Sequence, residues 1–271
     1  MRRIFSHYLP DLGGMFLLFA LFLVGALLGN ILILGLGAVS MEFVNLYGTV
    51  ISYPVMFIPP LLYAYVKSRS NESDTEACPL DSNRFGKLGG AKMALVVSVA
   101  TLATAFMTDA LNTVLPETPQ WFEDAMNQIM DAPVWITLIS VSVFAPLFEE
   151  WLCRGLVLRG LLRQMNPTSA IVVSAIFFAV LHMNPWQAVP AFILGILFGY
   201  VYYKTGSLKL TMLMHCVNNT FAVIFSKIPS FESAENFMDV MSPWAYVCVF
   251  AACITFLTGA VAVLKEIPSQ E

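Results

Sequence analysis

Hydrophobic residues follow one another along this chain in long runs, which short polar segments separate. A helix needs about 20 consecutive apolar residues to cross the hydrocarbon core of a bilayer, which is about 30 Å thick. Eight runs approach that length, and each predicts a membrane-spanning helix. Their ranges are 15–37, 47–66, 92–114, 133–153, 168–184, 187–204, 208–226 and 243–264. The fourth is expected to continue as helix to about residue 164, and the fifth is the shortest.

The composition supports this pattern. Hydrophobic residues make up 58% of the 271 positions and charged residues only 12%, whereas soluble domains carry about 25% charged residues. We therefore predict the all-α class: a polytopic transmembrane helical bundle that forms a single membrane domain over residues 1–271. The sequence contains no basic cluster, so nucleic acid is not expected among its partners.

The positions of lysine and arginine predict the orientation of the spans. Basic residues occur at 2–3, 67–92, 154–163, 204–209 and 265, whereas 38–46, 115–132 and 183–186 contain none and 227–242 contains only Lys227. Cytoplasmic loops carry an excess of Lys and Arg. We expect an integral protein of a prokaryotic plasma membrane with eight crossings and both termini in the cytoplasm.

One predicted outer loop has the pattern of a short amphipathic helix. Between residues 116 and 131, apolar side chains recur at helical spacing from Trp121 to Met130, with most acidic residues between them. This pattern predicts a helix that lies on the outer membrane interface. Residues 228–242 show a weaker version of it, for which an ordinary folded loop is an equal alternative.

Polar side chains inside the predicted spans are concentrated in the second half of the chain. A charged side chain in the membrane costs about 2.5 to 3.5 kcal/mol on insertion scales, so such groups usually serve a function. The candidate site residues in the fourth, fifth and seventh spans are Glu149, Glu150, Arg154, His182, His215 and Asn219. Together they place a candidate site in this half of the protein.

Helical spacing predicts how the charged residues of the fourth span pair. Glu150 and Arg154 are four residues apart and share a helix face, with the carboxylate first. Glu149 points about 100° away on a helix of 3.6 residues per turn, so we expect it to have another partner. Pro146 removes a backbone hydrogen bond just before the acidic pair and is expected to disturb the helix there.

A carboxylate, two imidazoles and an amide are the groups that acyl hydrolysis by water requires. The carboxylate takes a proton from water, and the other groups donate hydrogen bonds to the oxyanion, at about 3 to 4 kcal/mol per donor. Structural roles remain open: the Glu150–Arg154 pair as a structural bridge, and an intramembrane histidine as a packing residue. Gly195 and Gly199 form a GxxxG pattern, which close helix packing explains.

Two other functions use the same residues. Zinc accepts carboxylate and imidazole ligands, so a zinc protease with Glu149, His182 and His215 as ligands is the alternative enzyme, although the sequence contains no HExxH motif. A transporter or scaffold is the non-enzymatic alternative. Transporters often carry paired repeats with broken helices in both halves, and the one-sided polar residues argue against one.

Three short motifs resemble those of a known family. Glu149-Glu150-x-x-x-Arg154, Phe178-x-x-x-His182 and His215-x-x-x-Asn219 are similar to the signature motifs of the CPBP family. These are the CAAX proteases and bacteriocin-processing (Abi) enzymes, which are intramembrane glutamate endopeptidases. The resemblance covers residues 146–219, the expected catalytic core.

The resemblance implies roles for the acidic motif and for the partners of the protein. Glu149 would be the base that activates water, and Glu150 and Arg154 would hold it in place. The enzyme would hydrolyse a peptide bond of a membrane-associated peptide or protein, lipidated or not. It would work in the lipid bilayer without a cofactor, with zinc as the minority alternative.

The resemblance also implies roles for the two histidine motifs. His182 would assist at the water and the scissile bond, and His215 and Asn219 would form the oxyanion hole. Their depths differ by sequence count. His215 lies about 9 Å from the cytoplasmic end of its span and His182 about 21 Å from the start of its own, at 1.5 Å per residue. Strong tilt or a late start of the fifth span would be needed to bring the two together.

Overall fold

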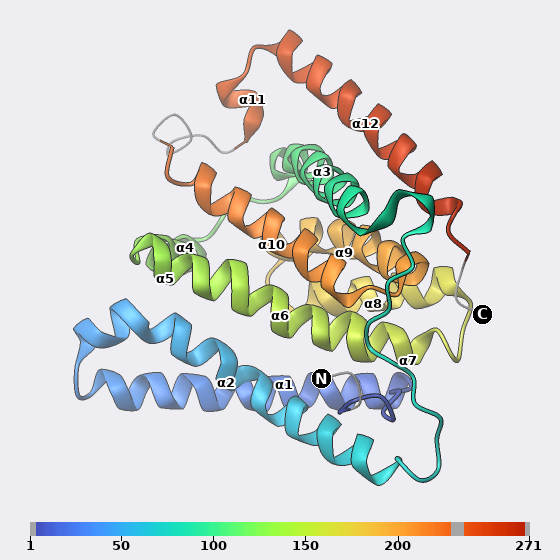
Figure 1. Ribbon diagram of the computed structural model, residues 1–271. Helices are drawn as coiled ribbons and strands as arrows, with labels where there is room; N and C mark the ends of the chain where they lie inside the picture. Colours follow the sequence, from blue (N-terminus) through green and yellow to red (C-terminus); the bar gives the residue numbers. More distant parts are fainter. Residues whose placement is uncertain (1–3, 229–235, 269–271) are drawn as a thin grey trace. The chain divides into compact units, whose positions relative to one another are not determined.

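The computed structural model describes residues 4–228 and 236–268, and all regular structure in those ranges is helical (Figure 1). Seven helices in the described part are long and apolar enough to cross a membrane. They are α1 Leu12–Gly37, α2 Met41–Ser70, the stretch Gly86–Asp109 that ends in α3 (Gly89–Asp109), Val134–Leu161, α9 Pro185–Thr205, α10 Leu208–Phe225 and α12 Pro243–Lys265. An eighth apolar helix, α8 Pro167–Leu181, is shorter. The predicted fold class is confirmed, and the chain is an integral membrane protein.

The helix ends differ from the predicted ranges mainly in three spans. The second span is longer at both ends, Met41–Ser70 against the predicted 47–66. The third predicted span continues past α3 only as a 3₁₀ turn, η2 (Ala110–Val114). The fifth ends at Leu181 instead of 184. There the N–H of His182 bonds to the carbonyl of Ala179, and Met183 has a φ of 54°. A left-handed residue cannot continue a right-handed helix, so His182 lies in the turn that follows α8.

The chain forms two compact units, each built from two separate segments. The first contains residues 4–81 and 119–166 of the described part. Within it α1 and α2 form an antiparallel pair (Figure 1). They approach so closely that a Cβ at Gly25 would collide with the carbonyl of Met56, which is why glycine occupies this position.

The N-terminal segment of the first unit is fastened to the end of the fourth span. The buried guanidinium of Arg159 donates to the carbonyls of Cys78, Phe5 and Tyr8 at 2.7–2.8 Å. A Cβ at Gly160 would collide with the carbonyl of Pro10. Arg159, whose sequence context predicted only a cytoplasmic charge, therefore binds three carbonyls from two distant backbone segments.

The predicted amphipathic helix is present in the first unit as α4 (Gln120–Met130). The hydroxyl of Thr137 donates to the carbonyl of Ile129 at 3.0 Å and joins the end of α4 to the next helix. Residues 228–242 were the weaker candidate for such a helix. Their described part contains one short helix, α11 (Phe237–Val240). Residues 229–235 of that candidate lie outside the described residues.

The second unit contains residues 82–118, 167–228 and 236–268 of the described part. Its core is formed by buried side chains of α3, α9, α10 and α12, among them Met93, Phe198, Met214 and Leu264. Gly206 ends α9 in the left-handed conformation with a φ of 64°. The next residue, Ser207, caps α10 by accepting a hydrogen bond from the N–H of Leu210.

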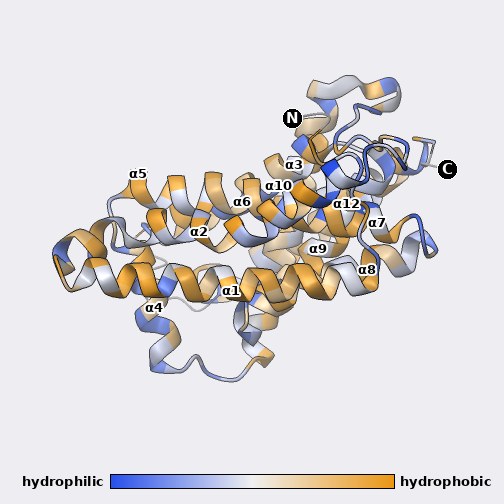
Figure 2. Cartoon of the chain, turned by 90° about the horizontal axis from the view of Figure 1, so that it is seen from below, coloured by the Kyte–Doolittle hydropathy of each residue, from blue (hydrophilic) through white to orange (hydrophobic). Residues whose placement is uncertain are grey.

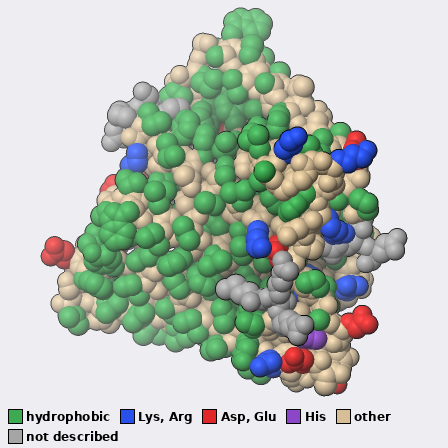
Figure 3. Space-filling view, in the orientation of Figure 1, with side chains coloured by type: hydrophobic (Ala, Val, Ile, Leu, Met, Phe, Trp, Pro, Cys, Tyr) green, Lys and Arg blue, Asp and Glu red, His purple; other side chains and the backbone are tan. Residues whose placement is uncertain are grey.

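Many large apolar side chains are exposed. Hydrophobic residues run along α1 and α2 in Figure 2, and hydrophobic side chains cover much of the face drawn in Figure 3, with few charged side chains among them. Exposed examples are Phe16, Leu34 and Trp244. An exposed apolar surface of this kind fits contact with lipid.

Candidate active site

The helix that carries the acidic motif changes its hydrogen-bonding register twice. It begins as α5 (Val134–Thr137) and becomes a π-helix, η3 (Leu138–Phe144), before the short α6 (Ala145–Glu150). A second π-helix, η4 (Trp151–Leu158), and α7 (Arg159–Leu161) follow. Pro146 is the second residue of α6, directly after the first π-helix, where a disturbance was predicted. π-helical turns are rare and occur frequently at functional sites.

Glu150 and Arg154 form the predicted ion pair. Nη1 of Arg154 lies 2.8 Å from Oε1 of Glu150, and both side chains are completely buried. Removing one partner of such a pair leaves an uncompensated buried charge, which costs about 3 to 5 kcal/mol. The pair therefore fixes the helix around the acidic motif.

Glu149 has a different partner, as the helical geometry predicted. Its Oε1 accepts a hydrogen bond from the hydroxyl of Tyr53 in α2. The two helices also pack through the residue before Glu149: the rings of Phe148 and Phe57 are stacked, with their centroids 5.2 Å apart. Glu150 is thus held by a cation of its own helix and Glu149 by a neutral donor of another helix. The two neighbouring carboxylates have distinct environments.

Tyr53 is a site residue that the sequence interpretation missed. It lies 96 positions before Glu149 in a span that carries none of the motifs. The only signal in the sequence was a polar hydroxyl in an apolar span. A tyrosine in a membrane helix can also serve packing or interface roles, so this signal is weak. Its pairing with Glu149 depends on how α2 packs.

His182 is held in the turn between α8 and α9. Its Nδ1 lies 3.0 Å from the carbonyl of Phe178, one helical turn earlier. If that nitrogen carries the proton, Nε2 is the acceptor of the ring. The amide of Asn184 donates to the backbone carbonyl of His182 at 2.8 Å and also caps α9. The side chain is half-buried, so the ring remains partly accessible.

His215 lies in α10 and is buried against aromatic rings of the second unit. The ring of Phe178 is 5.5 Å from that of His215 and 5.2 Å from that of His182, edge to face in both cases. The two imidazoles therefore contact one phenyl ring, despite their different depths by sequence count. Counting along a helix measures depth only for helices that cross upright and start at the same level.

Gly195 of α9 supports this arrangement. A Cβ at Gly195 would lie 3.1 Å from the Cβ of Ala175 and 3.3 Å from Cδ1 of Phe178. These distances are tighter than most real contacts, so close packing of α9 on α8 needs glycine here. The packing role predicted for this glycine is confirmed.

Asn219 follows His215 by one turn of α10, and its amide is oriented by a neighbour. The amide nitrogen of Asn218 donates to Oδ1 of Asn219 at 3.0 Å. In this assignment the side-chain nitrogen of Asn219 is its donor group. Asn218, for which no chemical role was predicted, therefore orients the amide beside it.

The six predicted site residues fall into two groups. Glu149, Glu150 and Arg154 belong to the first unit, and His182, His215 and Asn219 to the second. Within each unit the expected neighbours are brought together. The convergence of all six on one site stays a prediction. Among the residues that the structure describes, no group of three or more His, Cys, Asp or Glu side chains is placed to hold a metal ion.

A helical membrane bundle with these two groups is the kind of protein that the resemblance to intramembrane proteases predicted. Residues 131–221 match the model of the family described as "Type II CAAX prenyl endopeptidase Rce1-like". That range includes all six predicted site residues, and the resemblance seen in the sequence is confirmed.

Two curated proteins are similar over part of the chain. "Membrane-embedded CAAX protease MroQ" of Staphylococcus aureus is 29% identical over 33% of this chain and 39% of its own length. "Putative membrane peptidase YdiL" of Bacillus subtilis is 23% identical over 40% of this chain and 42% of its own length. The matches thus span about two fifths of each relative. No solved structure matches.

Proposed function

We propose that this protein is an intramembrane endopeptidase that hydrolyses a peptide bond of a membrane-associated substrate by glutamate-activated water. The observation that carries the proposal is that the two neighbouring carboxylates have different bonding partners. Arg154 lies against Glu150, whereas Glu149 accepts a hydrogen bond from the neutral hydroxyl of Tyr53. A general base must accept a proton from water, and the ion pair with Arg154 already engages the carboxylate of Glu150. Glu149 is therefore the proposed base.

The histidine motifs supply the remaining groups of the proposed reaction. His182 assists at the water and the scissile bond, and its ring is oriented by the carbonyl of Phe178. His215 and Asn219 donate to the oxyanion that forms on the scissile carbonyl. The bond from Asn218 to Oδ1 of Asn219 supports this role, because it fixes the orientation of the Asn219 amide.

Glu149→Gln tests the assignment. Glutamine keeps the shape and can still accept from Tyr53, but it cannot take a proton from water, so hydrolysis should fall at least about a thousandfold. The measurement compares the peptide termini of membranes that contain wild-type or variant protein, followed by cleavage of the substrate found. Glu42→Gln, an exposed acidic residue at the start of α2, is the matched control and should keep full activity. Retention of most activity in a folded Glu149→Gln protein would refute the assignment.

The substrate class is the second part of the proposal. The names of the matched family and of MroQ refer to CAAX proteins, and here the substrate is proposed only as a membrane-bound peptide or protein. Matched peptides with and without a prenyl group would show whether lipidation is required. The proposed reaction uses no metal, so activity should survive strong chelators. Loss on chelation with recovery on adding zinc would support the zinc alternative.

The proposed orientation places both termini in the cytoplasm. Lys92 lies at the start of α3 and Lys204 at the end of α9, whereas the opposite ends of these helices carry Asp109 and Trp186. This agrees with the charge pattern of the loops. A cysteine introduced near Gln270 should react only with reagents that enter the cytoplasm. Labelling from the outside would overturn the topology.

A further inference from the structure

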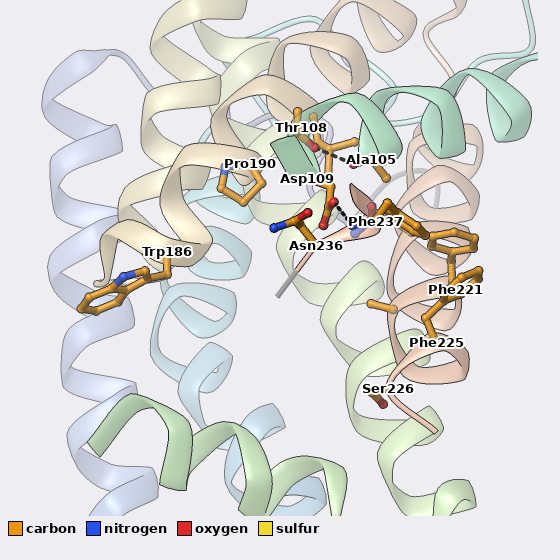
Figure 4. A pocket seen from close by; sticks show the side chains of 13 residues that line it. Ala105, Thr108, Asp109, Trp186, Pro190, Phe221, Phe225, Ser226, Asn236 and Phe237 are labelled. Carbon is orange, nitrogen blue, oxygen red and sulfur yellow. Dashed lines mark hydrogen bonds between the residues drawn. The ribbon is translucent and has the colours of Figure 1, made fainter. Parts of the chain in front are cut away.

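A cavity of about 440 Å³ lies at one end of the second unit (Figure 4). Its walls come from the last residues of α3, the first part of α9, the second half of α10 and residues 236–237. None of the six candidate catalytic residues is among those that line it. The volume falls in the range of about 300 to 1,000 Å³ that is typical of small-molecule sites. We therefore asked which chemistry the walls would recognise.

Among the described residues that line the cavity, one has an ionisable side chain: Asp109, the last residue of α3. Its Oδ2 accepts a hydrogen bond of 2.7 Å from the backbone N–H of Phe237, and Figure 4 shows the carboxylate directed toward Asn236 and Phe237. The N–H is a neutral donor and does not cancel the negative charge. A partly buried carboxylate attracts cations more strongly than one in water, because the surrounding dielectric constant is lower.

Most other polar groups in the cavity wall already donate their hydrogens to backbone carbonyls of the protein. The hydroxyls of Thr108 and Ser226 each donate to a carbonyl of their own helix, at 3.0 and 2.9 Å. The indole N–H of Trp186 donates to the carbonyl of Pro116 at 2.7 Å. These hydroxyl oxygens can offer a ligand only lone pairs, and the amides of Asn218 and Asn236 are the remaining wall groups that keep donors. The wall therefore favours a ligand that donates hydrogen bonds.

Aromatic rings form the rest of the wall. Phe221, Phe225 and Phe237 make one cluster, with centroid distances of 4.2 Å between the first two and 5.4 Å between the last two. Trp186 lines the cavity as well (Figure 4). Aromatic faces attract cations and also bury apolar surface. A ligand with a cationic head and an apolar body would match both features.

We propose that this cavity is a binding site for an organic primary ammonium with an apolar body, with Asp109 as its counter-ion. A primary ammonium has three N–H donors for the carboxylate and the hydroxyl oxygens, whereas a quaternary one has none. The source is a free amine or the ethanolamine headgroup of a lipid, which share this chemistry. In the proposed orientation this end of the unit faces the outside, away from Lys92 and Lys204. The proposal goes beyond the proposed protease chemistry, with which the cavity shares Asn218, the residue that orients the amide of Asn219.

Calorimetric titration of the full-length protein in detergent tests the charge requirement. Phenethylammonium should bind, and its neutral analogue 2-phenylethanol should bind at least about tenfold more weakly. Asp109→Asn keeps an acceptor for the N–H of Phe237 but removes the charge, and it should weaken phenethylammonium binding at least about tenfold. Asp124→Asn, the same change at an exposed position of α4, should leave the affinity unchanged.

Lipid nanodiscs distinguish the two sources. Phosphatidylethanolamine in place of phosphatidylcholine should lower the apparent affinity for phenethylammonium if the lipid headgroup occupies the site, and should leave it unchanged if a free amine does. The proposal is overturned if the wild type does not bind the amine, if the alcohol binds equally well, or if Asp109→Asn binds as tightly as the wild type. If Asp109→Asn does not fold, Phe221→Leu reduces the aromatic wall instead. Unchanged amine affinity in that variant would also contradict the proposal.

Discussion

The acidic motif of the first unit and the two imidazoles of the second are held by different kinds of contact. Glu150 and Arg154 form a completely buried ion pair, and Glu149 accepts from Tyr53. The imidazoles of the second unit instead lie against the ring of Phe178. The first group is organised by charge and hydrogen bonds, the second largely by shape. Charge substitutions should therefore disrupt the first unit, and substitutions that change size should disrupt the second.

The difference follows from the charge that each group carries. A buried carboxylate requires a cation or a strong donor, because its desolvation costs several kcal/mol. An imidazole is a flat ring that can pack edge to face against a benzene ring, and aromatic pairs of this kind contribute about 0.5 to 1.5 kcal/mol each. A single hydrogen bond, from the ring to the carbonyl of Phe178, then sets the orientation of His182.

The largest expected effect is the loss of the buried cation. Arg154→Met should destabilise the protein by about 3 to 5 kcal/mol, because Glu150 would keep a buried charge without its partner. The double variant Glu150→Leu with Arg154→Met should regain most of that stability. Unfolding in detergent, followed by helical circular dichroism, measures both.

The exposed pair of Arg69 and Glu72 supplies the control for this experiment. Its two atoms are 3.0 Å apart, but both side chains are more than half exposed. Arg69→Met should cost at most about 1 kcal/mol. If Arg154→Met costs no more than Arg69→Met, the acidic motif is not organised by its charge.

A change of size at Phe178 should break the second group. Phe178→Leu keeps the site apolar but removes the ring that both imidazoles contact, so we expect about 1 to 3 kcal/mol of destabilisation and at least tenfold slower hydrolysis. Phe177→Leu is the matched control, since Phe177 is buried in the same helix. It should cost similar stability and leave the rate per folded molecule nearly unchanged. Equal losses of activity in both variants would mean that Phe178 has no special role.

Removal of one hydroxyl should have a smaller effect on stability. Tyr53→Phe deletes the donor to Glu149 and should cost about 1 kcal/mol. If Tyr53 positions the proposed base, kcat should fall about tenfold while KM stays the same. Tyr47→Phe in the same helix, whose ring packs on Phe43 and Trp135, should change neither constant. A Tyr53→Phe protein with unchanged kcat would make the contact purely structural.

The smallest effect is expected in the amphipathic helix α4. Trp121 is 61% exposed, so Trp121→Ala should change stability by no more than about 0.5 kcal/mol. Hydrolysis should remain within about twofold of the wild type, because the aromatic ring is proposed only to anchor the interface. Severe loss of activity in a stable, folded Trp121→Ala protein would show that this segment handles substrate.

Features that depend on local spacing were predicted well. The spans agree with the helices to within a few residues at most ends, because the length of an apolar run is a property of consecutive positions. The Glu150–Arg154 pair was predicted for the same reason, since residues four apart meet on any α-helical turn. The role of Gly195 also followed from a local pattern.

Features that depend on distant segments were not predictable. The partner of Glu149 lies 96 residues away, and no spacing rule connects Tyr53 with it. Arg159 was expected as one more cytoplasmic charge, yet it binds three backbone carbonyls from two other segments. The contact of both imidazoles with Phe178 contradicted the simple count of depth, because the two helices need not be upright or start at one level.

The sequence by itself determined where most of the helices lie and which polar residues occur in or beside the apolar helices. Those properties follow from hydropathy and from the repeat of a single helix, which act over a few neighbouring positions. Only the tertiary structure decided that Tyr53 holds Glu149, that Gly25 allows α1 to approach α2, and that Asp109 shares a cavity with a cluster of aromatic rings. These contacts join residues far apart in the chain, and packing brings them together through the combined energies of many side chains.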